Sequence, residues 1–197
     1  MAGVDRGADG PEAGVSETVA AQVVDHGFEE VLSRHHEKCT IWYMPEQRRT
    51  NQTIHITGTS TAAPHRVFEV LIDTARWPDW APMSAAEIQQ PAAGDEPEGL
   101  GAIRRFTTGR TVSVERVVAF DRDRAFSYEL ISGLPLLDYR ADVTLEPTAG
   151  GGTAITWHSE FRPKRPGTGW IYRLALKRFI GDLVSRLART AERARVD

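Results

Sequence analysis

The spacing of apolar residues first predicts a helical stretch near the N-terminus. Over residues 16–38, apolar side chains recur three and four positions apart, which is typical of an amphipathic helix with Ser16 as its N-cap. Gly27 weakens this helix by about 1 kcal/mol relative to alanine. Residues 1–15 are rich in Gly, Ala, Asp and Pro, so we expect them to be disordered. The polar residues 45–52 are interpreted as a linker.

Strand alternation begins after this linker, where Ile54 and Ile56 alternate with polar neighbours. Pro64 then opens a helix over residues 64–77, because proline suits a first helical turn. One face of that helix is apolar and consists of Val67, Phe68, Leu71 and Ile72. Two prolines follow, so residues 75–83 are expected to form a turn or a short second helix.

Six further strands are predicted in the middle of the chain, separated by short turns rich in Gly, Asp and Ser. They cover residues 85–90, 102–107, 112–120, 126–131, 139–146 and 153–162. Short connections of this kind join antiparallel neighbours. The sequence therefore predicts a meander, in which the short strand 85–90 lies at an edge of the sheet.

A long amphipathic helix is predicted from Trp170 to about Ala194. Its apolar face consists of Leu176, Ile180, Leu183, Leu187 and Ala191, and its other face of Arg173, Lys177, Arg178, Asp182, Arg186 and Arg189. At ~1.5 Å per residue such a helix is roughly 37 Å long. A helix of this length is best buried by a sheet that curls around it. We therefore predict an α+β fold, with a curved antiparallel sheet of about seven strands around the C-terminal helix.

The composition fits one domain with an extension. We assign residues 1–50 to an N-terminal extension and residues 51–197 to one globular domain. Hydrophobic residues make up 41% and charged residues 26%, which is the balance of a soluble globular protein. No stretch has the 18 or more apolar residues of a membrane span, and the N-terminus lacks the features of a signal peptide. Cys39 is the one cysteine, which excludes an internal disulfide and favours a cytoplasmic location.

Charge is unevenly distributed along the chain. The net charge is −3, yet residues 162–195 contain ten Lys and Arg against Asp182 and Glu192. The rest is therefore acidic, which argues against nucleic acid as a partner. The basic side of the last helix has two interpretations. It is either a solvated face with cations near the helix C-terminus, or a surface that docks transiently on an anionic membrane.

Three segments carry a resemblance to a known family: TSTAAPHRVFEVLIDTARWPDWAP (59–82), VSVERVVAFDRDRAFSYELISGLPLLDYRADVTLEP (112–147) and GGTAITWHSEFRPKRPG (151–167). Residues 52–194 resemble the SRPBCC or START-like superfamily, in particular its polyketide cyclase/dehydrase-like lipid-transport group. The resemblance implies a helix-grip fold, two short helices after the first strand, and an internal pocket for a hydrophobic ligand. The first 43 residues have no counterpart in that pattern. Met44 is therefore a candidate translation start, and a family-specific N-terminal helix is the alternative.

Two tyrosines are predicted to face the pocket, because alternate residues of a strand point to the same side of the sheet. The apolar sets are Phe126, Tyr128 and Leu130 in one strand and Tyr139, Ala141, Val143 and Leu145 in the next. An apolar wall with a few fixed hydroxyls suits a small-molecule site. The alternative is that both tyrosines belong to the core. Leu183, on the apolar face of the last helix, is predicted to close the same pocket.

Two strands leave their inward face open. In residues 112–120 the inward set is either Val112, Val114, Arg116 and Val118, or Ser113, Glu115 and Val117. Resemblance to the plant abscisic-acid receptors, which place a glutamate of a similar S-x-E-R segment in the cavity, implies Glu115. In residues 153–162 apolarity favours Trp157 inside, whereas an enzyme would need His158 there.

Arg104 and Arg105 are adjacent, so a regular strand points them to opposite faces. Arg104 shares its face with Phe106, a large apolar side chain, which favours Arg104 and Phe106 as the inward pair. An inward arginine could lie at the cavity mouth with its head in water. A buried guanidinium would instead need a carboxylate, such as Glu115 or a ligand acid.

Binding or transport of a hydrophobic small molecule, lipid or polyketide-like, is the predicted function. The candidate ligand-binding residues are Tyr128, Tyr139, Trp157, Glu115, Arg104, Phe106 and Leu183. The alternative is a polyketide cyclase or dehydratase in which His158 or Glu115 moves protons and Arg104 or a tyrosine stabilises an enolate. No cofactor is expected. No metal site is expected either, since His35 and His36 lack a second cluster of ligands.

Overall fold

Seven antiparallel strands form one sheet in a computed structural model that describes residues 50–193. Their order across the sheet is β1-β7-β6-β5-β4-β3-β2. The strands are β1 (Gln52–Ser60), β2 (Ala85–Gln90), β3 (Ile103–Thr108), β4 (Thr111–Asp121), β5 (Ala125–Ser132), β6 (Leu136–Pro147) and β7 (Thr153–Pro163). The six strands from β2 to β7 form a meander with β2 at one edge, which confirms the prediction. The predicted helix at 16–38, the residues around Met44 and the His35–His36 pair lie outside the described residues.

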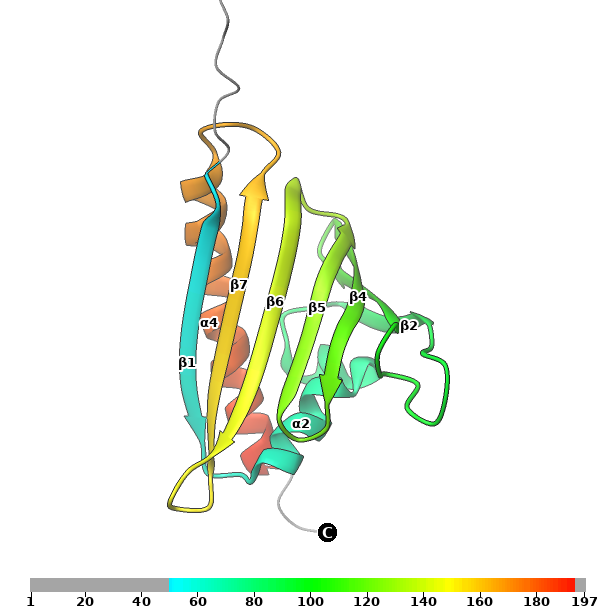
Figure 1. The fold of residues 1–197 in the computed structure, drawn as a ribbon, viewed down its shortest axis with the longest axis vertical. Coiled ribbons are helices and arrows are strands. Elements are labelled where there is room, and N and C mark those ends of the chain that lie inside the picture. The colour runs from blue at the N-terminus through cyan, green and yellow to red at the C-terminus, as the bar shows by residue number, and fades with distance from the viewer. Residues whose placement is uncertain (1–49, 194–197) are drawn as a thin grey trace, which may run out of the picture. The chain divides into compact units, whose positions relative to one another are not determined.

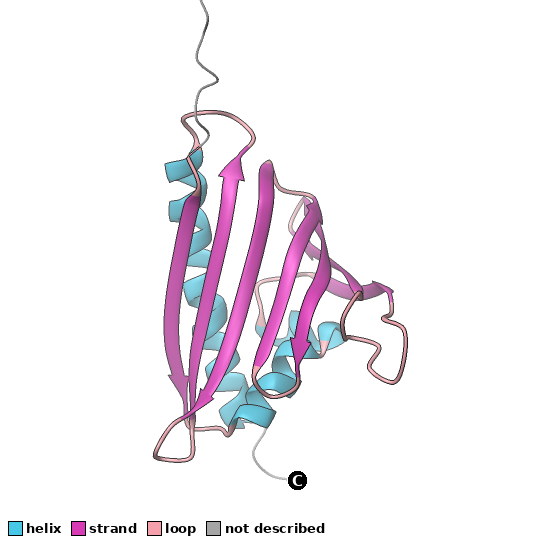
Figure 2. Cartoon of the chain, in the orientation of Figure 1, coloured by secondary structure: helices cyan, strands magenta, loops and turns pink. Residues whose placement is uncertain are grey.

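The helices cover one face of this sheet, as Figures 1 and 2 show. β1 is followed by α2 (Pro64–Ile72), the 3-10 turn η1 (Thr74–Arg76) and α3 (Trp77–Trp80), and α4 (Gly169–Arg193) ends the described chain. α4 lies along β1 and β7 (Figure 1). The predicted helix-grip arrangement, with two short helices after the first strand, is therefore confirmed. No helix within residues 50–193 is both long and apolar enough to cross a membrane.

Two predicted boundaries were wrong. The helix expected over residues 64–77 breaks at Asp73, whose backbone (φ −66°, ψ 85°) is not helical. The Asp73 carboxylate instead accepts a hydrogen bond from the backbone N–H of Arg76, at 3.3 Å, and so caps the next turn. β6 begins at Leu136, three residues before the predicted Tyr139, since Leu136 is buried and pairs with Pro163 of β7.

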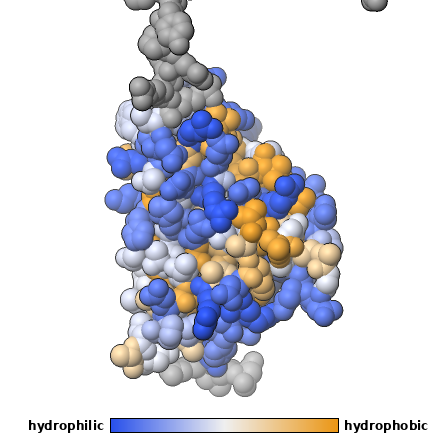
Figure 3. Space-filling view, in the orientation of Figure 1, coloured by the Kyte–Doolittle hydropathy of each residue, from blue (hydrophilic) through white to orange (hydrophobic). Residues whose placement is uncertain are grey.

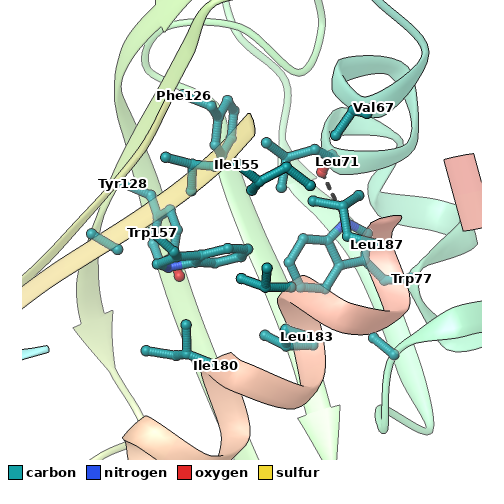
Figure 4. Close-up of a cluster of buried hydrophobic side chains, with 14 of the residues drawn as sticks. Val67, Leu71, Trp77, Phe126, Tyr128, Ile155, Trp157, Ile180, Leu183 and Leu187 are labelled. Atoms are coloured by element: carbon teal, nitrogen blue, oxygen red, sulfur yellow. Dashed lines mark hydrogen bonds between the residues drawn. The ribbon is translucent and has the colours of Figure 1, made fainter. Parts of the chain in front are cut away.

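The core fills the space between the sheet and α4. Figure 4 shows Trp157 of β7 packed above Ile180 and Leu183 of α4, while α2 contributes Val67 and Leu71. Trp77 donates its indole N–H to the carbonyl oxygen of Leu71, at 3.0 Å, which ties α3 to α2. On β1, Gly58 permits the close approach of α4, because a Cβ at this position would lie 2.5 Å from Cγ1 of Val184.

The opposite face of the sheet is exposed and is not uniform. Figure 3 shows hydrophilic side chains over much of β1 and β7, and apolar ones gathered over β4 and β5. Val112, Val114 and Ile131 point to this outer face and are partly or fully exposed. The largest fully buried side chains, among them Trp157, Arg104 and Phe106, lie on the other side. Space for a small molecule is therefore expected between the sheet and α4.

Candidate functional site

A cavity of about 230 Å³ lies between the sheet and the first half of α4. Its apolar wall consists of Trp77, Met83, Leu130, Leu134, Leu176, Phe179, Ile180 and Leu183. Its polar groups are Thr108, Thr111, Ser113, Glu115, Tyr128 and Tyr139. This volume lies below the roughly 300–1,000 Å³ of sites for drug-sized ligands, so the cavity suits a small molecule.

The mouth of the cavity lies where its wall is least buried. Thr108 and Thr111, at the turn between β3 and β4, are exposed, and Leu134 of the loop between β5 and β6 is half-buried. Leu176 of α4 is half-buried as well. Two strand connections and the beginning of α4 therefore surround the opening.

Strand alternation explains which side chains reach the interior. Phe126, Tyr128 and Tyr139 are buried on the helix side, as the sequence predicts, and Leu130 lies on the cavity wall. In β4 the second of the two predicted sets points inward, since Ser113 and Glu115 line the cavity and Val117 is buried. The register of β4 against β5 shifts between Val114 and Glu115, at a β-bulge.

Arg104 is fully buried, and its charge is compensated inside the core. Its Nη2 donates to Oε2 of Glu115 at 3.1 Å. Its guanidinium carbon lies 4.6–5.4 Å from the centroids of four aromatic rings, those of Trp77, Phe106, Phe126 and Tyr128. Nε and Nη1 have no hydrogen-bond partner among the described residues, so the ring faces take the place of acceptors.

The two adjacent arginines point to opposite faces of the sheet, as predicted. Arg104 and Phe106 face inward as predicted, while Arg105 is partly exposed and pairs with Glu87 at 3.1 Å. The interpretation of an inward arginine with its head in water is wrong. Arg104 is instead the buried guanidinium that needs a carboxylate, and Glu115 supplies it.

Glu115 is the link between this buried pair and the cavity. Its side chain is 14% exposed and lines the cavity, and its second oxygen, Oε1, has no hydrogen-bond partner among the described residues. Burial raises the pKa of Glu115 above its usual value, and the neighbouring Arg104 offsets only part of this rise. Among the residues of the wall, Glu115 alone carries a formal charge. The cavity therefore presents a hydrogen-bond acceptor and no cation.

Two phenols complete the polar part of the wall. The hydroxyl of Tyr139 lies 3.3 Å from Oγ of Ser159, and its ring centroid lies 6.2 Å from that of Tyr128. Burial raises the pKa of Tyr139 to about 12 and the pKa of Tyr128 well above its usual value. Both phenols therefore keep their protons near neutral pH and can donate hydrogen bonds.

His158 lies on the wrong side of the sheet for chemistry in this cavity. Its side chain is 37% exposed, and its Nε2 lies 3.1 Å from Oε1 of Glu160. Its ring faces that of His55 across β1 and β7, at 6.1 Å between centroids. The neighbouring Trp157 takes the inward position, which confirms the apolar prediction, and alternation then forces His158 outward. The prediction that His158 moves protons in the cavity is wrong.

The other predicted site residues occupy two layers. Tyr128, Tyr139, Glu115 and Leu183 lie on the wall itself. Arg104, Phe106 and Trp157 lie behind it, each in contact with a residue of the wall: Arg104 with Glu115, Phe106 with Trp77, and Trp157 with Tyr128. These three are therefore placed to support the wall, and contact of any of the seven with a ligand stays a prediction.

The sequence did not single out several residues of the wall. Ser113 belonged to the same inward set as Glu115, so it reached the wall once that set pointed inward. Thr108 and Thr111 lie at a turn, where alternation gives no signal. For Met83 and Phe179, nothing in the sequence distinguishes an apolar side chain that lines a cavity from one that is packed in the core. Within residues 50–193, no group of three or more His, Cys, Asp and Glu side chains could hold a metal ion.

Comparison with known proteins gives a family and a fold. The model of the family described as "Polyketide cyclase / dehydrase and lipid transport" matches residues 51–192. No functionally curated protein matches the sequence. A START superfamily protein from Mycobacterium smegmatis is similar in structure, with a TM-score of 0.63 and 14% identity over 72% of this chain and 97% of its own.

Two solved enzymes share the fold as well. Norcoclaurine synthase from Thalictrum flavum, in complex with dopamine and hydroxybenzaldehyde, has a TM-score of 0.60 and 16% identity, over 75% of this chain and 90% of its own. The Zhui aromatase/cyclase from Streptomyces sp. R1128 has a TM-score of 0.60 and 16% identity, over 73% of this chain and 95% of its own. At these identities the likeness concerns the fold alone.

Replacing Arg104 tests the buried pair. Arg104→Met removes the counter-charge of Glu115, and we expect the free energy of unfolding to fall by about 3–5 kcal/mol at neutral pH. A buried carboxyl whose folded pKa is raised stabilises the fold below its unfolded pKa of about 4.3, and that contribution is lost as pH rises through the folded value. Urea unfolding of the variant should therefore show a smaller loss at pH 4.5 than at pH 8.

Two further variants serve as controls for this experiment. Arg105→Met, at the partly exposed neighbour, should cost no more than about 1 kcal/mol. Arg104→Met/Glu115→Gln should recover most of the lost stability, because no unpaired charge remains in the core. A loss that is the same at both pH values, with no recovery in the double variant, would contradict the assignment.

Proposed function

We propose that this chain, which belongs to the polyketide cyclase/dehydrase and lipid-transport family, binds and carries a small hydrophobic molecule in the cavity beneath α4. The observation that carries this proposal is the cavity itself, with its eight apolar wall residues and its few fixed polar groups. Such a site binds mainly by removing apolar ligand surface from water. Its volume of about 230 Å³ favours a ligand of one or two rings, or a short chain.

The polar end of the ligand is proposed to be a hydrogen-bond donor. Glu115 offers an unpartnered carboxylate oxygen, and no Lys or Arg side chain is part of the wall. A ligand carboxylate would place a second negative charge next to Glu115 without a free cation to balance it. A hydroxyl, phenol or amine would instead make a charge-assisted hydrogen bond. The Tyr128 and Tyr139 hydroxyls would donate to a carbonyl group of the same ligand in exchange for their present contacts with each other and with Ser159.

Catalysis by a cyclase or dehydratase has weaker support from the site. Glu115 is a carboxylate at the cavity, as such a mechanism needs, but His158 is on the outer face. Arg104 lies behind Glu115 and is not part of the wall, so it is poorly placed to stabilise an oxyanion on a bound substrate. Tyr128 and Tyr139 do lie on the wall, so a tyrosine is the remaining candidate for that role. Carriage is therefore the function that we propose. We also propose a cytoplasmic location, since the single Cys39 rules out an internal disulfide.

Binding of a neutral apolar probe tests the proposed cavity. We expect 2-naphthol to bind the full chain with 1:1 stoichiometry in isothermal titration calorimetry. Leu183→Trp projects a larger side chain into the cavity and should weaken this binding at least tenfold. Leu100→Trp, on an exposed loop, is the matched control and should leave the affinity unchanged. Absence of saturable binding, or equal binding by the Leu183 variant, would contradict the proposal.

The charge of the ligand's polar end is tested by Glu115→Gln. Wild type should prefer 2-naphthol to 2-naphthoic acid at pH 7 by at least tenfold, because the naphthoate meets Glu115. In Glu115→Gln the naphthol affinity should fall roughly tenfold, since a hydrogen bond to a charged group contributes about 1.5–3 kcal/mol. The naphthoate should gain affinity, because the negative charge that repels it is removed. Glu87→Gln, at an exposed carboxylate, is the control. Equal affinities for both probes in wild type would refute the proposed donor end.

A further inference from the structure

The first two turns of α4 carry apolar side chains that point into solvent. Trp170, Ile171 and Leu174 are 63%, 48% and 65% exposed. Among the described residues, the other large hydrophobic side chains with such exposure are Leu100 and Ile131, which lie on a loop and on the outer face of the sheet. Scattered exposed residues need no explanation, but three within five positions form a patch of the kind that marks an interaction site.

The same segment is rich in cations that have no counter-charge. Residues 164–181 contain no Asp or Glu and carry five cations, Lys164, Arg165, Arg173, Lys177 and Arg178. None of these five side chains makes an ion pair or hydrogen bond with another described residue. Elsewhere in the domain Arg140, Arg162 and Arg186 each pair with a carboxylate. This segment therefore brings five uncompensated cations together beside the apolar patch.

Helix stability does not account for these cations. Basic side chains stabilise a helix near its C-terminus, where the dipole is negative. Arg173, Lys177 and Arg178 lie instead in the N-terminal half of α4, where the dipole gives them no advantage. The helix dipole therefore gives no reason for the cations in this half of the helix.

The segment also borders the cavity. Leu176, Phe179 and Ile180, on the inner side of the same turns, are part of the cavity wall, and Leu176 lies at the mouth. A surface that covered the outer side of these turns would therefore lie next to the opening through which a ligand passes.

We propose that this α4 surface, made of Trp170, Ile171, Leu174 and the five cations, docks on an anionic lipid membrane. The three apolar side chains would enter the boundary between headgroups and acyl chains, where tryptophan is favoured. The five cations would attract the anionic headgroups, each contributing to the affinity in a salt-dependent way. An apolar patch with cations beside it fits an extended, uniformly anionic surface. Docking would also bring the cavity mouth to the lipid bilayer, in which a hydrophobic ligand dissolves.

Co-sedimentation with lipid vesicles tests the proposal on the full chain. We expect binding to vesicles of phosphatidylglycerol and phosphatidylcholine, little binding to phosphatidylcholine alone, and weaker binding at high salt. W170S/I171S/L174S and R173Q/K177Q/R178Q should each lower the partition coefficient at least tenfold. L100S and R124Q remove an exposed leucine and an exposed arginine elsewhere and should bind like wild type. Because all these positions are exposed, thermal unfolding should confirm that every variant is folded.

Several results would overturn the proposal. One is a full chain that stays in the supernatant with anionic vesicles, and another is binding that neither triple variant changes. A dimer in solution that W170S/I171S/L174S dissociates would assign the surface to a second copy of the chain. If a chain that starts at Met44 binds the vesicles and the full chain does not, the occupant of the α4 surface in the full chain would be residues 1–43. In both cases the membrane would not be the occupant in the intact protein.

Discussion

The ion pair between Arg104 and Glu115 is the interaction on which the interior of this domain depends. A guanidinium removed from water costs several kcal/mol unless it is paired. The register of β3 against β4 places Arg104 directly opposite Glu115, and four aromatic rings surround the charge. One strand pairing thus fixes both the stability of the core and the chemistry of the cavity, because the carboxylate that neutralises Arg104 is also the charged group on the wall.

α4 connects this interior to the surface. Gly58 lets the helix lie close to β1, and Leu183 and Ile180 then close the cavity on its helix side. The first turns of the same helix expose apolar and cationic side chains on their outer side. Carriage of a hydrophobic molecule and docking on a membrane are therefore two proposals about opposite sides of one element. They rest on different residues, so either can fail without the other.

Much of the fold could be predicted from the sequence, because strand alternation and helix periodicity are local signals. They identified the meander, α4 and the inward position of Tyr128 and Tyr139. Other features depended on information that periodicity lacks. The break at Asp73 arises from a side-chain cap. The inward position of Glu115 depended on which alternate set of residues faces inward in a strand with a bulge. His158 faces outward because the bulkier, apolar Trp157 next to it is buried. Periodicity also does not indicate how far an inward side chain lies from the cavity. Arg104, Phe106 and Trp157, which lie behind the wall, could therefore not be distinguished from the residues that line it.

Native mass spectrometry of the full chain, purified from its own host, tests the central claim most directly. The claim is that the cavity holds a small apolar molecule whose polar end donates a hydrogen bond to Glu115. We expect a non-covalent adduct of one small molecule per chain, which carries a hydroxyl, phenol or amine group and no carboxylate. A chain that is consistently free of ligand and is not stabilised by any member of an apolar library, or an adduct that is a carboxylic acid, would contradict the account.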